Sequence, residues 1–366
     1  MGKEHTERLR RAGEATEDAG LHALLVTPSA DLVYLTGYDP LPLERLTCLV
    51  IRADRDPVLI VPGLERPLAE QRLARHVTEI RSWDETDDPY ALVAGVVGAK
   101  ASRLACTDRM WASHLLGIQR ALPKARATTA SRVLGPLRAV KDRHELHMLA
   151  RAARGTDEAF RRLLEERIEG MTEHEVAGRL GELMLELGLD RVEFAIVGSG
   201  PNAASPHHKP MDRSLRAGDA VVMDFGGTTG GYCSDMTRTV VVGEASARLR
   251  EVHEVVAEAQ EVAVRAVRPG VPAEDVDRAA RQVIERAGYG DRFIHRTGHG
   301  IGLEAHEDPY IVEGNAEPLR PGMCFSVEPG IYLEGDLGVR IEDIVVVTQD
   351  GARRLNHAPR ELTTVR

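Results

Sequence analysis

The sequence predicts an α+β fold for residues 137–366, preceded by a smaller α/β domain in residues 1–136. At 366 residues the chain is too long for one ordinary hydrophobic core and long enough for two domains. In the first third, strand-like and helix-like runs alternate, which is typical of an α/β domain. After residue 136 the strands and helices are grouped instead, which favours an antiparallel sheet.

In the N-terminal third, two runs are rich in Val, Ile, Leu and Thr and are separated by turn residues, which predicts strands. These runs are 23–37 and 46–62, and helices are expected over 64–75 and 88–97. Gly135-Pro136 is the expected domain boundary, read as a linker-like turn before a new helix.

In the remaining part, helical spacing of apolar residues predicts a helix from 141 to 167. Thr172, followed three residues later by Glu175, is a capping box that begins a second helix ending near Gly188. Further helices are expected over 247–267 and 273–287. Strands are expected over 192–200, 220–227, 235–243, 323–333 and 338–348.

The composition of the chain argues against several classes of function. Residues 1–136 hold equal numbers of acidic and basic side chains, so residues 137–366 hold the whole net charge of −10. An acidic C-terminal part argues against nucleic-acid binding, which needs a basic surface. The sequence contains no apolar run long enough to cross a membrane, and its charged first twenty residues predict no secretory leader. Its four scattered cysteines form no C-x-x-C pair, so a cytoplasmic location is expected.

Four carboxylates and one histidine lie in strand or glycine-rich contexts where an isolated charge is costly. They are Asp224 in VVMDFGG, Asp235 in CSDMTRT, His299 in TGHGIG, Glu328 in SVEPGIY and Glu342 in VRIED. The glycine-rich turn between the two aspartates predicts a hairpin that brings them side by side. The glycines beside His299 allow the backbone to approach closely.

Each of these residues taken alone is more commonly an ordinary salt-bridge partner. Converging without a metal, however, the four carboxylates would raise one another's pKa and repel. Two divalent cations remove that conflict and can generate hydroxide near neutral pH. An oxygen-rich ligand set favours Mn²⁺, with Co²⁺, Fe²⁺ or Zn²⁺ as alternatives.

In this order and context, the five motifs resemble the pita-bread metallopeptidase family, in the branch of Xaa-Pro dipeptidases (prolidases) and Xaa-Pro aminopeptidases. The resemblance covers residues 137–366, and all five ligand positions match. The N-terminal part is similar only in size and α/β character. The resemblance implies a curved antiparallel sheet covered by helices, a two-metal site, short Xaa-Pro peptides as substrates and a homodimer.

The resemblance also implies the catalytic roles. Glu328 would act as general base while remaining a ligand, and His306 would help to stabilise the oxyanion. His207 would assist at the imide nitrogen, although the adjacent His208 competes for that position. Arg340 shares a strand face with Glu342 and would orient a ligand carboxylate or bind a substrate carboxylate.

Simple packing is an alternative to a functional role for three further side chains. Tyr332 can reach the site or simply pack, whereas Cys233 and Cys324 are expected to pack and not to bind metal. The alternatives at the level of function are a hydrolase of a small non-peptide molecule, a metal-free creatinase-type enzyme and a non-catalytic binding protein. The choice between dipeptidase and aminopeptidase stays open, because it depends on how the cleft is closed beyond proline.

Overall fold

The structure, a computed structural model, describes residues 2–73 and 79–366. The chain divides into two compact units, Met1–Arg138 and Ala139–Arg366. Helix α6 (Ser131–Ala139) contains both Gly135 and Pro136, so the linker-like turn expected there is wrong. Buried Val133 and Leu134 on this helix supply the packing that offsets the backbone hydrogen bond lost at the proline.

The N-terminal unit is a mixed sheet with helices around it. Its six strands follow the order β4-β3-β2-β1-β5-β6, in which β1–β2 and β2–β3 are antiparallel and the other pairs are parallel. The strands are β1 (Ala23–Val26), β2 (Cys48–Arg52), β3 (Arg55–Pro62), β4 (Glu79–Trp83), β5 (Arg103–Cys106) and β6 (Arg126–Thr129). The helices are α1 (Gly2–Asp18), α2 (Ala30–Thr36), the short η1 (Gly63–Glu65), α3 (Arg66–Leu73), α4 (Pro89–Val97) and α5 (Ala112–Ala121).

The strand expected over 23–37 is wrong in its second half, which forms helix α2. Leu32 and Leu35 are fully buried at helical spacing, and Gly37 ends the helix in the left-handed conformation at φ 71°. Burial of this face outweighs the strand preference of Val33 and Tyr34. The helix expected over 64–75 is confirmed as far as Leu73, and residues 74–75 lie outside the described residues.

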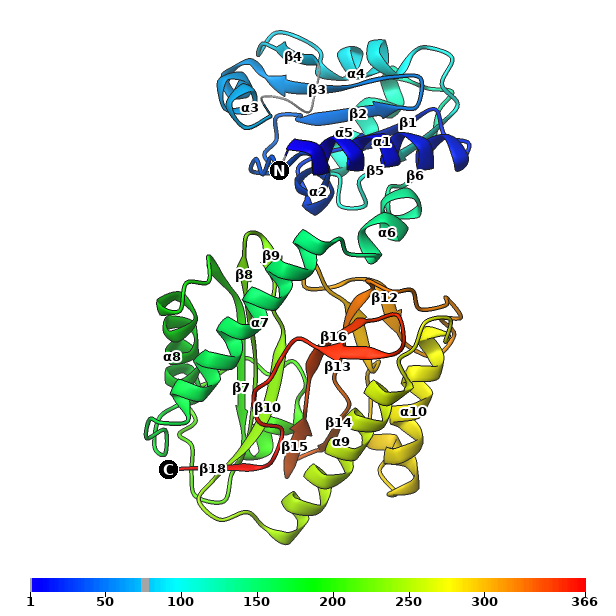
Figure 1. Cartoon of the computed structure of the whole chain (residues 1–366). Coiled ribbons are helices and arrows are strands. Elements are labelled where there is room, and N and C mark those ends of the chain that lie inside the picture. Colours follow the sequence, from blue (N-terminus) through cyan, green and yellow to red (C-terminus); the bar gives the residue numbers. More distant parts are fainter. Residues whose placement is uncertain (1, 74–78) are drawn as a thin grey trace. The chain divides into compact units, whose positions relative to one another are not determined.

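The C-terminal unit contains two five-stranded sheets and a two-stranded ribbon (Figure 1). One sheet has the order β18-β10-β8-β7, with β9 also pairing with β8. Its strands are β7 (Arg191–Ser199), β8 (Ala220–Thr229), β9 (Tyr232–Cys233), β10 (Met236–Val242) and β18 (Thr363–Val365). All of its pairs are antiparallel except β10–β18, a parallel edge pair that the sequence did not predict.

The second sheet has the order β12-β11-β13-β16-β17 and is antiparallel throughout. Its strands are β11 (Gly298–Gly300), β12 (Glu307–Ile311), β13 (Cys324–Val327), β16 (Asp343–Val347) and β17 (Ala352–Arg354). Strands β14 (Gly330–Leu333) and β15 (Leu337–Arg340) form the ribbon.

Two pairs of helices bury the outer faces of these sheets. Helices α7 (Arg143–Leu163) and α8 (Glu173–Glu186) share a core with β7, β8 and β10. Helices α9 (Ala247–Ala266) and α10 (Ala273–Arg286) share another with β13 to β16, and they run beside one another opposite α8 (Figure 1). The short helices η2 (Gly200–Ala204) and η3 (Gly290–Arg292) complete the unit. The capping box at Thr172 and Glu175 is confirmed.

Side-chain alternation along β8 decides which residues face inward. Val221, Met223 and Phe225 pack against α7 and α8, so Asp224 points to the opposite face of the sheet. The two helix pairs cover the outer faces of the sheets, and the opposite, inner faces hold the polar side chains. Within the described residues, none of the helices combines the length and the apolar character needed to cross a bilayer.

Candidate metal centre and active site

A tight hairpin places the two aspartates on one face. Gly230 and Gly231 both have positive φ, at 58° and 81°, and form the two-residue turn that joins β8 to β9. In the register of β8 with β10, Asp224 lies opposite Thr237. Asp235 is two residues before Thr237, so its side chain lies on the same face as that of Asp224.

His299 lies on β11, where neighbouring strands come too close for any side chain on the flanking residues. A Cβ at Gly298 would lie 1.9 Å from the carbonyl oxygen of Ser326, and one at Gly300 would lie 2.2 Å from that of Asp308. Both contacts involve backbone atoms, which cannot swing away. The expected role of these glycines, to let the backbone approach closely, is confirmed.

The two glutamates lie just beyond the ends of strands. Glu328 comes after the last residue of β13, and Glu342 lies between β15 and β16. The hydroxyl of Thr237 donates to Glu342 Oε2 at 2.6 Å, and that of Ser326 donates to Glu328 Oε1 at 3.1 Å. Glu342 is thus oriented by a hydroxyl from β10, a strand of the other sheet, and Glu328 by a hydroxyl from β13, the strand that precedes it.

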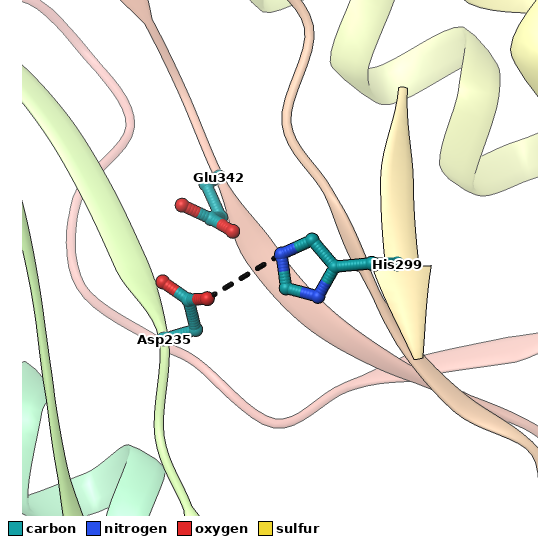
Figure 2. Close-up of side chains that lie close together, drawn as sticks. All are labelled: Asp235, His299 and Glu342. Carbon is teal, nitrogen blue, oxygen red and sulfur yellow. Dashed lines mark ion pairs between the residues drawn. The ribbon is translucent and has the colours of Figure 1, made fainter. Parts of the chain in front are cut away.

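The side chains of Asp235, His299 and Glu342 point toward one another (Figure 2). Each offers a ligand atom, and these atoms lie within 4.8 Å of one another. His299 Nε2 lies 3.2 Å from Glu328 Oε1 and 3.6 Å from Asp235 Oδ2. His299 Nδ1 lies 3.1 Å from the carbonyl oxygen of Gly300 and donates to it, which turns Nε2 toward the carboxylates.

The four carboxylates of this cluster are not balanced by an equal number of positive charges. Burial, followed by the negative charges of neighbouring carboxylates, raises the pKa of Asp235 and of Glu342 well above the usual range. Burial also raises the pKa of Asp224, although Arg340 opposes the shift. Desolvation acts the same way on Glu328, but its hydrogen bond to His299 and the charge of that histidine lower its pKa to about 2.

Two buried carboxylate oxygens at the cluster have no hydrogen-bond partner among the described residues. They are Asp224 Oδ1 and Glu342 Oε1. Buried acceptors without a partner are costly, and a cation satisfies them. The orphaned oxygens, the raised pKa values and the available imidazole nitrogen together fit divalent metal ions held by oxygen and one nitrogen.

The cluster forms one wall of a cavity of about 810 Å³. The cavity is lined by all five predicted ligands and by the other predicted catalytic residues His207, His306 and Arg340. Phe194, Ile196 and Ile294 add apolar surface to it. The structure therefore brings every site residue predicted from the sequence to a single cavity.

The loop between η2 and β8 separates the roles of the two adjacent histidines. His207 lines the cavity, whereas His208 Nε2 contacts Glu173 Oε2 at 2.7 Å. The buried Glu173 carboxylate also accepts hydrogen bonds from Ser199, Asn202 and the backbone of Met211. His208 thus anchors the loop, and His207 is the one that faces the cavity.

Each nitrogen of the Arg340 guanidinium already donates a hydrogen bond to a neighbouring side chain. Its guanidinium donates to Asp224 Oδ2 at 2.6 Å, to the Tyr332 hydroxyl at 2.8 Å and to Thr237 Oγ1 at 3.1 Å. Tyr332 is buried, and desolvation raises the pKa of its hydroxyl to about 12. Tyr332 is not among the residues that line the cavity, and its hydroxyl contacts two residues that are, Arg340 and His295.

His306 faces the cavity beside His299, with ring centroids 4.0 Å apart. Desolvation, followed by the positive charges of His299 and Arg296, lowers the pKa of His306 to about 4. A neutral imidazole is therefore the form present at pH 7. It can still donate one hydrogen bond.

Sequence reasoning missed His295, which lines the cavity. Its Nε2 lies 2.8 Å from the Tyr332 hydroxyl, so it joins the Arg340 network from the other side. The signal was its position four residues before His299. Cys233 and Cys324 are buried among apolar side chains, as expected, and burial raises the pKa of both thiols.

The fold and the site define a class of protein, and the chain belongs to metallopeptidase family M24, whose model matches residues 147–349. Residues 8–140 match the creatinase/prolidase N-terminal domain. The C-terminal unit accordingly has the pita-bread fold, as predicted.

Three proteins similar to this chain indicate which members of the family it resembles. The probable dipeptidase PepE of Mycobacterium tuberculosis is 46% identical over 99% of this chain and 96% of its own length. The crystal structure of the dipeptidase PepE from Mycobacterium ulcerans has a TM-score of 0.95 at 46% identity, covering 100% of this chain and 98% of that one. The Xaa-Pro dipeptidase of Lactobacillus helveticus is 35% identical over 95% of this chain and 96% of its own length.

Proposed function

We propose that this protein is a two-metal peptidase that hydrolyses the Xaa-Pro bond at the N-terminus of short peptides. The observation that carries the proposal is the convergence of four carboxylates and one imidazole on a single cavity, with two buried oxygens left without partners. Relatives named Xaa-Pro dipeptidase support the choice of substrate.

Five residues would hold the metal ions: Asp224, Asp235, His299, Glu328 and Glu342. The oxygen-rich set favours Mn²⁺, with Co²⁺, Zn²⁺ or Fe²⁺ as alternatives. When bound, the ions act as Lewis acids and lower the pKa of water. Arg340 holds Asp224, and Thr237 holds Glu342, so each of these carboxylates keeps one oxygen directed by the protein.

The remaining side chains divide the proton transfers. Glu328 would accept the proton of the attacking water at its carboxylate, because it lies on the cavity wall with a pKa that leaves it ionised. The neutral His306 would donate its ring hydrogen to the developing oxyanion. His207 would assist at the imide nitrogen, which carries no hydrogen of its own.

The cavity also suits a proline ring. Phe194, Ile196 and Ile294 give it apolar surface near the polar cluster, and Ile294 is 65% exposed. Apolar walls with a few polar groups are the usual character of a small-molecule site. The homodimer and the cytoplasmic location stay predictions of the sequence.

The test compares chelated protein with protein reconstituted with Mn²⁺, using Ala-Pro and Ala-Ala as substrates. The reconstituted protein should hydrolyse Ala-Pro faster than Ala-Ala, and the chelated protein should hydrolyse neither. Asp235→Asn should abolish the activity, because it removes a charged ligand. The matched control is Asp336→Asn, at an exposed turn between β14 and β15, which should retain full activity. Full activity of the chelated protein, or of Asp235→Asn, would contradict the proposal.

A further inference from the structure

A buried ion pair joins Lys141 to Glu307 in the C-terminal unit. Lys141 Nζ lies 2.7 Å from Glu307 Oε1, and the two side chains are 1% and 7% exposed. Burial raises the pKa of the nearby Cys324 thiol, and the charges of Lys141 and Glu307 then act on that pKa in opposite directions. A buried ion pair often adds little net stability, because the desolvation of both charges offsets their attraction. The pair is therefore a candidate for fixing the position of a neighbouring group.

Lys141 is the rigidly held end of this pair. Its backbone nitrogen donates to the carbonyl oxygen of Gly322 at 2.9 Å. Val140, the residue before it, forms an antiparallel β-bridge with Met323, just ahead of strand β13. Asp142, the residue after it, is the N-cap of helix α7. The ammonium group of Lys141 is thus presented by a segment that is bound both to the sheet and to a helix.

Glu307 lies where the pairing of β11 with β12 is interrupted. His299 pairs with Tyr310, but the next residue, Gly300, pairs with Glu307, so the register skips residues 308 and 309. An irregularity of this kind disrupts the ladder of backbone hydrogen bonds locally. The sheet by itself therefore holds this end of β12 less firmly than a regular ladder would, and the ion pair supplies an additional anchor there.

The loop between β11 and β12 packs against the anchored carboxylate. A Cβ on Gly302 would lie 2.6 Å from Glu307 Oε1, so the loop comes closer to this carboxylate than a side chain at that position would allow. The carbonyl oxygen of Gly302 also accepts a hydrogen bond from the backbone nitrogen of Cys233 at 2.8 Å. The loop ends in His306, which faces the cavity beside His299, whereas Glu307 lies outside the cavity lining. The ion pair thus fixes the chain at the residue directly after His306.

We propose that Lys141 and Glu307 are positioning residues that hold the imidazole of His306 in the cavity. The proposal rests on the proposed function, in which His306 donates its ring hydrogen to the developing oxyanion. Such a donor acts only within hydrogen-bond distance of the oxyanion, and a displacement of about 1 Å can cost roughly a hundredfold in rate. The ion pair acts from behind the loop and makes no contact with the substrate.

The experiment replaces both charges together by apolar side chains of similar volume, in the variant Lys141→Met/Glu307→Leu, because removing one partner alone would leave a buried unpaired charge. The Mn²⁺-loaded variant should fold and hold as much metal as the wild type. Its kcat for Ala-Pro should fall by about tenfold to a hundredfold with KM unchanged, since the contact of His306 with the oxyanion exists only in the transition state. The matched control, Arg161→Gln/Glu165→Gln, removes an exposed ion pair of α7 and should behave as wild type.

A double-mutant cycle with His306→Ala separates positioning from general support of the fold. Because the ion pair acts through His306, its replacement in a His306→Ala background should cause no further loss of kcat. A loss in that background as large as in the wild-type background would overturn the proposal. Wild-type kcat in Lys141→Met/Glu307→Leu would overturn it as well.

Amide hydrogen exchange of the metal-free protein, measured by mass spectrometry, gives a second readout that needs no hydrolysis. In Lys141→Met/Glu307→Leu, residues 301–307 should exchange faster than in the wild type, while helix α8 keeps its wild-type rate. Unchanged exchange in residues 301–307, or faster exchange throughout the C-terminal unit, would contradict a local positioning role. If the proposed function alone is wrong, even the wild type does not cleave Ala-Pro, and the local change in exchange persists.

Discussion

Replacing His253 by phenylalanine should remove a defined part of the acid sensitivity of the C-terminal unit. His253 lies on α9 and is 5% exposed, and its Nε2 has no hydrogen-bond partner among the described residues. Desolvation lowers the pKa of this imidazole from 6.5 to about 4, with Glu361 opposing the shift. The folded protein thus holds His253 neutral over a range in which the unfolded chain protonates it.

The sign and size of the effect follow from that difference. Above pH 6.5 both states hold His253 neutral, and the residue contributes no pH dependence. Between pH 6.5 and about 4 the unfolded state binds the extra proton, so the free energy of unfolding falls as the pH falls. At pH 5 the loss is about 2 kcal/mol, and below pH 4 it levels off at roughly 3 kcal/mol.

The assay is urea unfolding of wild type and His253→Phe, both metal-free, at pH 8 and pH 5. The acidic cluster titrates in both proteins and cancels in the comparison. Because Trp83 and Trp111 both lie in the N-terminal unit, their fluorescence follows that unit, and the C-terminal unit is followed by the part of the far-UV circular dichroism change that does not coincide with the fluorescence change. The difference in unfolding free energy should shift by about 2 kcal/mol in favour of the variant from pH 8 to pH 5. A difference that stays constant between the two pH values would refute the reasoning.

Two further predictions concern the support of the site. Glu173→Gln weakens the acceptor that anchors the loop of His207, so kcat for Xaa-Pro hydrolysis should fall by roughly tenfold or more while the metal content, measured by mass spectrometry, stays unchanged. Loss of metal in that variant would contradict this division of roles. Gly298→Ala brings a Cβ against the Ser326 carbonyl and should lower the free energy of unfolding by about 1–3 kcal/mol. The thermal unfolding midpoint and the metal content should both fall as a result. Gly178→Ala, at an open helical position, should be neutral or stabilising, and equal effects of the two glycine changes would argue against the close approach.

Local chemistry made much of the site predictable from the sequence. The capping box at Thr172 and the glycines beside His299 act through neighbouring atoms, so their residue types identify their roles. Asp224 could be placed because side chains alternate along a strand, and an aspartate in an apolar run must face something polar. These inferences need only the period of the element and the cost of a buried charge.

The parts that could not be predicted depend on contacts between distant residues. The contact of His295 with Tyr332 joins residues that are 37 positions apart in the sequence, and that of Asp277 with Thr297 spans 20 positions. Helix α2 forms where β-branched and aromatic residues favour a strand, because burial of Leu32 and Leu35 decides the outcome. Packing of that kind leaves no fixed spacing in the sequence.

A pair of metal ions should be held by Asp224, Asp235, His299, Glu328 and Glu342. The most direct test titrates Mn²⁺ into chelated protein and measures bound metal and the electron paramagnetic resonance spectrum at each addition. Two ions should bind per chain, and the filled site should give the spectrum of two exchange-coupled ions, lost in Glu342→Gln. Saturation at one ion, or two ions without magnetic coupling, would contradict the two-metal account.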